Sequence, residues 1–244
     1  MKSPYKADET VIQELKEKLV IASRIIDHED LARPLGHVSA RILGVEAFLI
    51  TRGVSPGIAT LDDIVVCDMN GTVVEGKYSR TFGEVYAHAG VYRKRSDVQS
   101  VAHTHSWHVM ALSMTETTVL PASFESMKVG YEPIALYKRI SFLDNLEVAE
   151  EVAELIGPNR AVILKGHGAI IVGKSIEEAT VSAIDLERAA KVQLLAASAG
   201  QLVLFTEEEK ERMVKFLRNV ESQAGTTNPF ARAWEYYKSQ VMRC

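Results

Sequence analysis

The side chains best suited to chemistry in this sequence are histidines that could share a metal ion. His103 and His105 form a His-x-His pair at the end of segment 98–104, whose apolar residues predict a buried strand. Residues two apart on a strand point to the same side, so both imidazoles can reach one cation. Such a pair alone is more often a surface pair or part of a packed core, so a metal site needs further support.

His167 supplies that support, because it lies between Gly166 and Gly168 in a strongly apolar stretch. The two glycines let a bulky ring approach another group closely, as a metal ligand must, although a buried turn histidine fits the same pattern. Three neutral imidazoles with an open coordination position are typical of a catalytic site, where the open position accepts substrate or water.

Glu84 is the carboxylate expected to act beside this site. It lies on a predicted helix over 82–94 whose C-terminal end leads into the His-x-His strand, so it could serve as a general base between the cation and the reacting carbon. A solvated glutamate on a helix is the alternative. His88 follows one helical turn later and can approach the site, whereas His108 is expected to lie outside the metal set.

Helices and strands alternate along the chain, which is typical of a sheet covered by helices. Apolar residues three and four apart predict one or two helices within 207–241, and helices over 9–27, 82–94, 108–114, 146–157 and 175–200. Predicted strands lie within 38–43, 47–51, 64–71, 98–104, 134–142 and 161–173. The third of these, 64–71, ends in an Asn-Gly pair that favours a hairpin turn. We therefore expect a three-layer α/β/α fold with a central mixed, largely antiparallel sheet flanked by helices.

The composition predicts one soluble domain. Of the 244 residues, 47% are hydrophobic and 25% charged, near the averages for globular proteins. Since no composition break marks a boundary, we expect a single domain over 1–244, with a core over about 9–220 and a helical tail over about 221–244.

Charge and cysteine content limit the possible partners. A formal net charge of -4 leaves no basic surplus for nucleic acid. The charged N-terminal segment has no apolar stretch of signal-peptide or membrane-spanning length, so we expect a cytoplasmic protein without a membrane partner. Cys67 and Cys244 are the only cysteines, so any metal must be held by histidine and carboxylate.

Five motifs together resemble those of a known family. In chain order they are GHVSAR at 36–41, FLITRG at 48–53, Glu84, VAHTHSWH at 101–108 and KGHGAIIVG at 165–173. Their order and intervals resemble the class II aldolase and adducin-head family, which includes fuculose-phosphate and rhamnulose-phosphate aldolases and ribulose-phosphate epimerase. The resemblance covers about residues 9–220 and is more specific for the fold and the metal site than for the substrate.

The resemblance implies a role for each of these residues. The family's three histidine ligands of a divalent ion fall on His103, His105 and His167, and its acid/base glutamate falls on Glu84. The ion is usually zinc, with manganese, cobalt or iron as alternatives. It would stabilise the enediolate left when a C–C bond breaks, which serves retro-aldol cleavage, decarboxylation and epimerisation alike. The family also implies a small-molecule substrate and a homotetramer with active sites between subunits.

The expected anion-binding residues depart from the family's phosphate pocket. Where the family has a Gly-Asn pair, a Thr-Gly turn and two serines, this chain has Gly36-His37, Thr51-Arg52-Gly53 and Phe82-Gly83. Hydroxyl donors to a phosphate are therefore lost. Arg52 could instead hold a carboxylate in a bidentate fork. Phe82 makes the pocket suit an aromatic or non-phosphorylated substrate, although packing at the helix start explains it equally well. Ser39 is also among the residues that we expect to bind the substrate or an anion.

Two further features could reach a neighbouring subunit. Glu125 falls near the position where the fuculose aldolase carries a tyrosine that acts on its neighbour's site, and it could donate a proton or be a surface charge. The aromatic residues Trp234, Tyr236 and Tyr237 could close over a pocket or bind a neighbour, but helix packing is the default explanation.

Three functions are compatible with these residues. The favoured one is a metal-dependent lyase that cleaves a C–C bond of a small hydroxy-keto or hydroxy acid, by retro-aldol reaction or decarboxylation. A sugar-phosphate aldolase or a pentulose-phosphate 4-epimerase is the alternative, against which the lost phosphate serines count. The third is a non-catalytic adducin-like interaction module, which would not require a complete set of histidines with Glu84.

Overall fold

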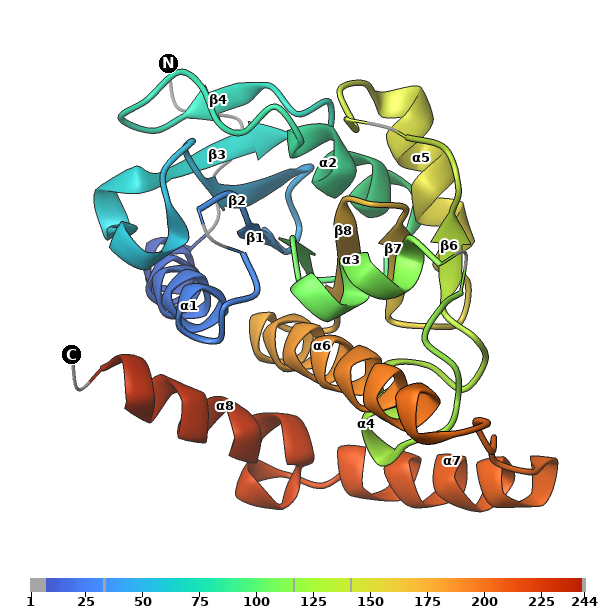
Figure 1. Cartoon of the computed structure of the whole chain (residues 1–244). Coiled ribbons are helices and arrows are strands. Elements are labelled where there is room, and N and C mark those ends of the chain that lie inside the picture. The colour runs from blue at the N-terminus through green and yellow to red at the C-terminus, as the bar shows by residue number, and fades with distance from the viewer. Residues whose placement is uncertain (1–7, 33, 116, 141, 243–244) are drawn as a thin grey trace.

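The computed structural model describes residues 8–242 apart from 33, 116 and 141, so Cys244 lies outside the described part. Eight strands of the described chain form one sheet (Figure 1). In chain order they are β1 (His37–Arg41), β2 (Ala47–Thr51), β3 (Ile64–Asp68), β4 (Val73–Glu75), β5 (Ser100–Thr104), β6 (Ala135–Tyr137), β7 (Ala161–Leu164) and β8 (Gly168–Gly173).

The helices occupy the segments in which the apolar spacing predicts them. They are α1 (Glu9–His28), α2 (Val85–Lys94), α3 (Trp107–Ser113), α4 (Phe124–Val129), α5 (Leu146–Leu155), α6 (Ile176–Ala199), α7 (Glu207–Glu221) and α8 (Pro229–Val241). The short helix α4 is an addition, because segment 124–129 carries no prediction of its own. No helix of the described residues is both long and apolar enough to span a bilayer.

The sheet is mixed and largely antiparallel, which confirms the prediction. Its strand order is β4-β3-β2-β1-β5-β8-β7-β6, and every neighbouring pair is antiparallel except β6 and β7. The predicted Asn-Gly turn joins β3 to β4, with Gly71 at a φ of 80°. Asp68 closes this turn, since its carboxylate accepts hydrogen bonds from the backbone amides of Asn70 and Thr72.

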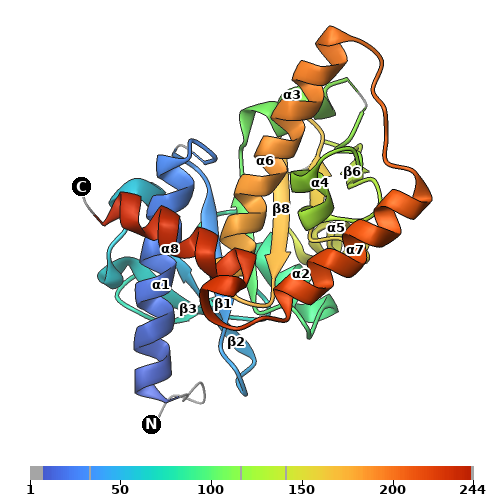
Figure 2. The same ribbon diagram turned by 90° about the horizontal axis from the view of Figure 1, so that it is seen from below.

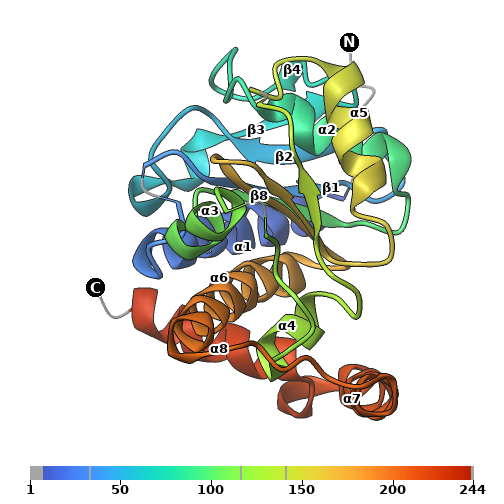
Figure 3. The ribbon, with the colours of Figure 1, turned by 45° about the vertical axis from the view of Figure 1, so that its right-hand side comes forward.

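Helices cover both faces of the sheet, so the three-layer expectation is confirmed. Helices α2 and α5 lie on one face and α1 and α6 on the other (Figure 3). Each face has its own apolar core, and the alternation along β8 shows why. Ile171 packs into the core beneath α1 and α6, whereas its neighbour Ile170 packs into the core beneath α2 and α5.

The C-terminal aromatics pack as helix core. Figure 2 shows α8 lying across α1, with its start beside one end of α6, outside the layer that α6 forms with α1. Trp234 and Tyr237 are buried in the core on this side of the sheet, whereas Tyr236 is exposed. The default explanation, helix packing, therefore accounts for Trp234 and Tyr237 within one chain.

The start of α2 differs from the prediction. The helix begins at Val85 rather than Phe82, and Glu84 is its N-cap residue instead of lying within it. Phe82 has the apolar spacing of a first turn, but its ring packs 4.2 Å from the His37 ring instead of joining the helix. The Glu84 side chain makes no capping hydrogen bond, because its carboxylate faces the histidines.

Strand register places the site residues side by side. In the antiparallel pairing of β1 with β5, His37 lies directly opposite His103, so the two side chains share one face of the sheet. On the other side of β5, Thr104 lies opposite Ala169, two residues after His167 in the turn between β7 and β8. Three segments distant in sequence thus meet at one end of the sheet.

Arg160 joins the C-terminal helices to the rest of the fold. Its Nε donates to Glu178 on α6 at 2.7 Å, and its Nη2 donates to Glu221 on α7 at 2.7 Å. Its Nη1 donates to the carbonyl oxygen of Lys128 on α4 at 2.6 Å. The side chain is only 17% exposed, so these interactions are poorly screened by water.

We expect Arg160→Met to lower the free energy of unfolding by about 3–5 kcal/mol, because it leaves Glu178 and Glu221 largely buried without a counter-charge. Urea unfolding followed by circular dichroism would measure the loss. Lys77→Met is the matched control, since its pair with Asp62 is exposed and should contribute less than about 1 kcal/mol. Equal effects of the two substitutions would contradict the structural role of Arg160.

Candidate metal centre

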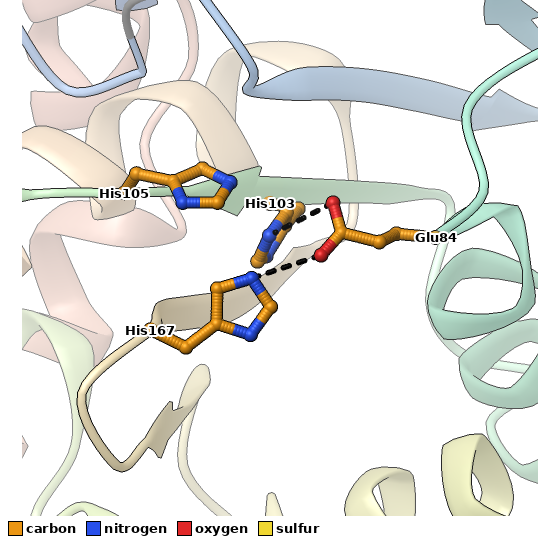
Figure 4. A group of neighbouring side chains, drawn as sticks. All are labelled: Glu84, His103, His105 and His167. Atoms are coloured by element: carbon orange, nitrogen blue, oxygen red, sulfur yellow. Dashed lines mark ion pairs between the residues drawn. The ribbon is translucent and has the colours of Figure 1, made fainter. Parts of the chain in front are cut away.

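Four side chains converge where β5 ends and the β7–β8 turn passes it. Figure 4 shows Glu84 facing His103 and His167 from the start of α2, with His105 on the opposite side of the group. One ligand atom from each residue lies within 4.8 Å of those from the other three. The structure therefore brings together the three predicted histidine ligands and the predicted glutamate.

The hydrogen bond behind His103 turns its free nitrogen toward the group. Nδ1 of His103 lies 3.0 Å from the carbonyl oxygen of Ala169, so Nδ1 carries the proton and donates it to that oxygen. Nε2 is then left with a lone pair, as a metal ligand requires. The Nε2 atoms of His103 and His105 are buried, and neither has a hydrogen-bond partner among the described residues. Unpaired buried nitrogens of this kind fit a bound cation.

Neutral rings are the form that binds a cation. Burial and the neighbouring imidazoles lower the pKa of His105 to about 3. The pKa of His37 falls to about 4, chiefly because this ring is completely buried. Both rings are therefore neutral near pH 7, so protons do not compete with a metal for His105.

Glu84 is held as an anion. Its Oε1 lies 2.9 Å from Nε2 of His167, and its Oε2 lies 3.4 Å from Nε2 of His103 and 3.5 Å from Nε2 of His37. Burial raises the pKa of Glu84, but the three imidazoles facing the carboxylate outweigh burial and hold the pKa far below its usual range. The N-terminus of α2 also favours a negative charge at this position.

Two glycines permit the close approach on which this geometry depends. A Cβ on Gly168 would lie 1.9 Å from the carbonyl oxygen of Thr104, so the turn that carries His167 can reach β5 only with glycine there. A Cβ on Gly36 would lie 2.1 Å from Cβ of Ala32 and 2.9 Å from the carbonyl oxygen of His103. The second contact sets the entry into β1, which carries His37.

The predicted anion-binding residues of β2 and the loop before α2 also lie together. The Thr81 hydroxyl donates to the carbonyl oxygen of Thr51 at 2.6 Å, which ties the Phe82-Gly83 segment to the end of β2, just before Arg52 and Gly53. Arg52 is anchored by residues that the sequence did not single out. Its Nε donates to Asp63 at 2.6 Å, and its guanidinium lies 4.4 Å from the Tyr78 ring centre.

Three other residues considered in the sequence do not join the group formed by Glu84 and the three histidines. Ser39 is fully buried, and its hydroxyl lies between His88 and Tyr92 rather than open to a substrate. Glu125 lies on α4, beside α6 and α7, and the structure does not bring it to the histidines of its own chain. His108 lies outside the metal set as expected, with Nδ1 2.6 Å from Glu187.

A cavity of about 480 Å³ adjoins His167. Its walls combine apolar and cationic side chains, among them Met114, Tyr137, Phe142, Leu164, Arg139 and Lys165. A largely apolar hollow with a few polar groups beside a metal-binding constellation is typical of a small-molecule site.

Comparison with known proteins identifies the family. Residues 17–194 match the Class II Aldolase and Adducin N-terminal domain. L-fuculose phosphate aldolase of Methanococcus maripaludis is 29% identical over 187 residues, which cover 75% of this chain and 97% of that protein. The 3,4-dihydroxyphthalate decarboxylase of Arthrobacter keyseri is 30% identical over 199 residues, which cover 76% of this chain and 79% of that protein.

The solved structures agree with the sequence comparison. L-fuculose 1-phosphate aldolase from Glaciozyma antarctica PI12 superposes with a TM-score of 0.81 at 25% identity, over 99% of this chain and 94% of that one. The chain therefore belongs to the class II aldolase and adducin family, as its motifs predict. The family and the four converging side chains together imply a divalent metal, and the relatives support an aldolase-type lyase with a small-molecule substrate.

We expect zinc to stabilise the protein through these histidines. At a free concentration about 100 times its dissociation constant, zinc should add about 2.7 kcal/mol and raise the melting temperature by about 5–10 °C. His103→Ala should abolish most of this shift, as differential scanning fluorimetry with and without zinc would show. His108→Ala, outside the group, is the control and should keep the shift. An equal shift in both variants would argue against the site.

Proposed function

We propose that this chain is a zinc-dependent lyase that breaks a C–C bond of a small hydroxy-keto or hydroxy acid. The observation that carries the proposal is the convergence of His103, His105 and His167 with Glu84 in reach. Imidazole ligands of this kind suit zinc, with manganese, cobalt or iron as alternatives. Three histidine ligands also leave a position for substrate oxygen.

The proposed chemistry divides between the metal and Glu84. A bound cation would supply Lewis-acid stabilisation of the enediolate left when the C–C bond breaks. Glu84 would move the proton at the adjacent carbon, since its carboxylate is ionised and lies at the edge of the ligand group. Because retro-aldol cleavage and decarboxylation share this electron flow, the two named relatives, an aldolase and a decarboxylase, are both consistent with it.

A carboxylate-bearing substrate is supported by the altered anion pocket. The Arg52 guanidinium is held in place, because its Nε donates to Asp63 and its plane lies over the Tyr78 ring. Its Nη groups can then donate hydrogen bonds to a planar anion such as a carboxylate. The Phe82 ring lies against His37, which adds an apolar wall close to the proposed base. The cavity beside His167 likewise combines apolar side chains with the cationic Arg139 and Lys165.

A sugar-phosphate aldolase is the second candidate. Its support is that relatives by sequence and by structure are named as fuculose phosphate aldolases. A pentulose-phosphate 4-epimerase, the other phosphate-dependent alternative, would use the same metal chemistry. The phosphate-binding hydroxyls that both would use are replaced here by Phe82 and Gly83. A purely adducin-like scaffold is disfavoured because it would have no use for four converging metal-binding groups.

We further propose a homotetramer with active sites between subunits. Large apolar side chains that line the cavity are exposed in the single chain, among them Met114, Ile140 and Phe142. A neighbouring copy would cover such a surface. In that arrangement Glu125 would act, if at all, on the site of a neighbour.

We expect Glu84→Gln to lower turnover by about 10²–10⁴-fold, because the amide cannot accept the substrate proton. Zinc content, measured by mass spectrometry, should stay near that of the wild type, since the three histidines remain. The control is Glu154→Gln, which alters an exposed partner of Lys94. A Glu84→Gln enzyme with full turnover on fuculose 1-phosphate or 3,4-dihydroxyphthalate would remove the role given to Glu84.

We expect Arg52→Gln to lower kcat/KM for carboxylate substrates by roughly 10–100-fold, since a charge-assisted hydrogen bond contributes about 1.5–3 kcal/mol. A panel of matched hydroxy-acid and sugar-phosphate substrates would measure it. Arg80→Gln changes an exposed arginine in the loop before α2 and should be neutral. Unchanged kcat/KM on every carboxylate would exclude Arg52 as the anion-binding residue, and a loss confined to phosphates would favour the aldolase candidate.

A further inference from the structure

A line of buried polar side chains leads away from Glu84 into the protein. After the 3.5 Å contact of Glu84 Oε2 with His37 Nε2, His37 Nδ1 lies 2.7 Å from His88 Nε2. His88 Nδ1 lies 2.6 Å from the Ser39 hydroxyl, which lies 2.7 Å from the Tyr92 hydroxyl. We call His37, His88, Ser39 and Tyr92 the buried column, since none is more than 2% exposed.

The column is built by two periodicities that coincide. His37 and Ser39 are two apart on β1, so both side chains point to the same face of the sheet. His88 and Tyr92 are four apart on α2, so they lie on one side of the helix that covers this face. Strand and helix therefore alternate their contributions, and each polar atom meets a partner from the other element.

The Glu84 carboxylate favours one direction of the hydrogen bonds. Because a carboxylate only accepts, it favours a ring proton on Nε2, the nitrogen of His37 that faces it. A neutral His37 then accepts at Nδ1, which requires His88 to donate from Nε2. His88 must in turn accept at Nδ1, and Ser39 Oγ is the donor in place.

Tyr92 completes the sequence of donors. Burial raises the pKa of Tyr92 well above its usual value, so this phenol keeps its proton and can donate to Ser39 Oγ. Burial also lowers the pKa of His88 well below the usual value, so this ring is neutral and has one donor and one acceptor. Every donor in the column is used once, and the only remaining N–H points from His37 toward the site.

We propose that His88, Ser39 and Tyr92 are positioning residues that hold His37 as the Nε2–H tautomer, so that it presents one fixed donor to Glu84 and to a substrate oxygen beside it. The proposal rests on the lyase function proposed above. The opposite tautomer would place a nitrogen lone pair against the carboxylate of Glu84. Packing of the buried His37 ring against Phe82 resists a ring flip that would replace the donor by a carbon.

The tautomer can be read directly, without a substrate. In protein labelled with ¹⁵N-histidine and loaded with zinc, long-range ¹H–¹⁵N correlation spectra distinguish protonated from unprotonated ring nitrogens. We expect the protonated nitrogen of His37, assigned from the His37→Asn variant, to be Nε2. A proton on Nδ1 of His37 in the wild type would overturn the proposal whether or not the lyase function holds.

Two substitutions at one position separate positioning from packing. His88→Met fills the space without a donor, so His37 should shift toward the Nδ1–H form, and kcat should fall by roughly 10–100-fold with KM and zinc content little changed. His88→Gln keeps an N–H that can reach His37 Nδ1 and should restore most of the turnover and the tautomer. Turnover of 3,4-dihydroxyphthalate and fuculose 1-phosphate would be assayed.

Ser39→Ala is the smaller change to use if His88→Met does not fold, and it should move tautomer and kcat in the same direction by less. Tyr86→Phe removes a partly exposed phenol from the same helix and is the matched control. Equal losses in His88→Met and His88→Gln, or an unchanged tautomer in both, would overturn the proposal. If the wild type turned over neither compound, the tautomer measurements alone would decide.

Discussion

Buried nitrogen lone pairs are the constraint on which this structure depends. His103 and His105 each carry a buried Nε2 with no hydrogen-bond partner in the described chain, an arrangement that costs free energy without a cation. Such rings can be buried only if the surrounding groups hold them in place. The carbonyl of Ala169 orients His103 from behind, and the Glu84 carboxylate faces it from the front. A bound metal would relieve the remaining unpaired nitrogens, which links folding to metal binding.

The sheet supplies the rigidity that these rings need. The three histidine ligands lie on β5, directly after it, or in the turn that joins β7 to its neighbour β8, within the middle of the sheet. Because these strands are covered on both faces, a shift of one residue in register would move a site histidine into an apolar core. The loop before α2 is tied to β2 by Thr81 and carries Phe82 and Gly83, which we propose face a substrate. Variation in this loop would then change the substrate without disturbing the ligands.

The sequence predicts what depends on local spacing and motif. The alternation of helices and strands yields the three layers, and the His-x-His and Gly-His-Gly motifs with Glu84 yield the four groups that meet. It does not predict which residues of helix α2 meet which residues of strand β1. His88 meets His37 across 51 positions and Ser39 across 49, and no periodicity encodes either contact. The predicted start of α2 at Phe82 is wrong for a related reason, because the Phe82 ring packs on His37 and the helix begins only at Val85.

Cys67 connects this architecture to reactivity. It lies on β3 within the core beneath α2 and α5, where burial raises the pKa of its thiol to about 12. The reactive thiolate is therefore almost absent in the folded protein, and the sulfur is also shielded from reagents. Alkylation of Cys67 consequently requires the layer that carries Glu84 and the buried column to open. The rate at which a thiol reagent labels Cys67 would therefore report how often the layer formed by α2 and α5 separates from the sheet.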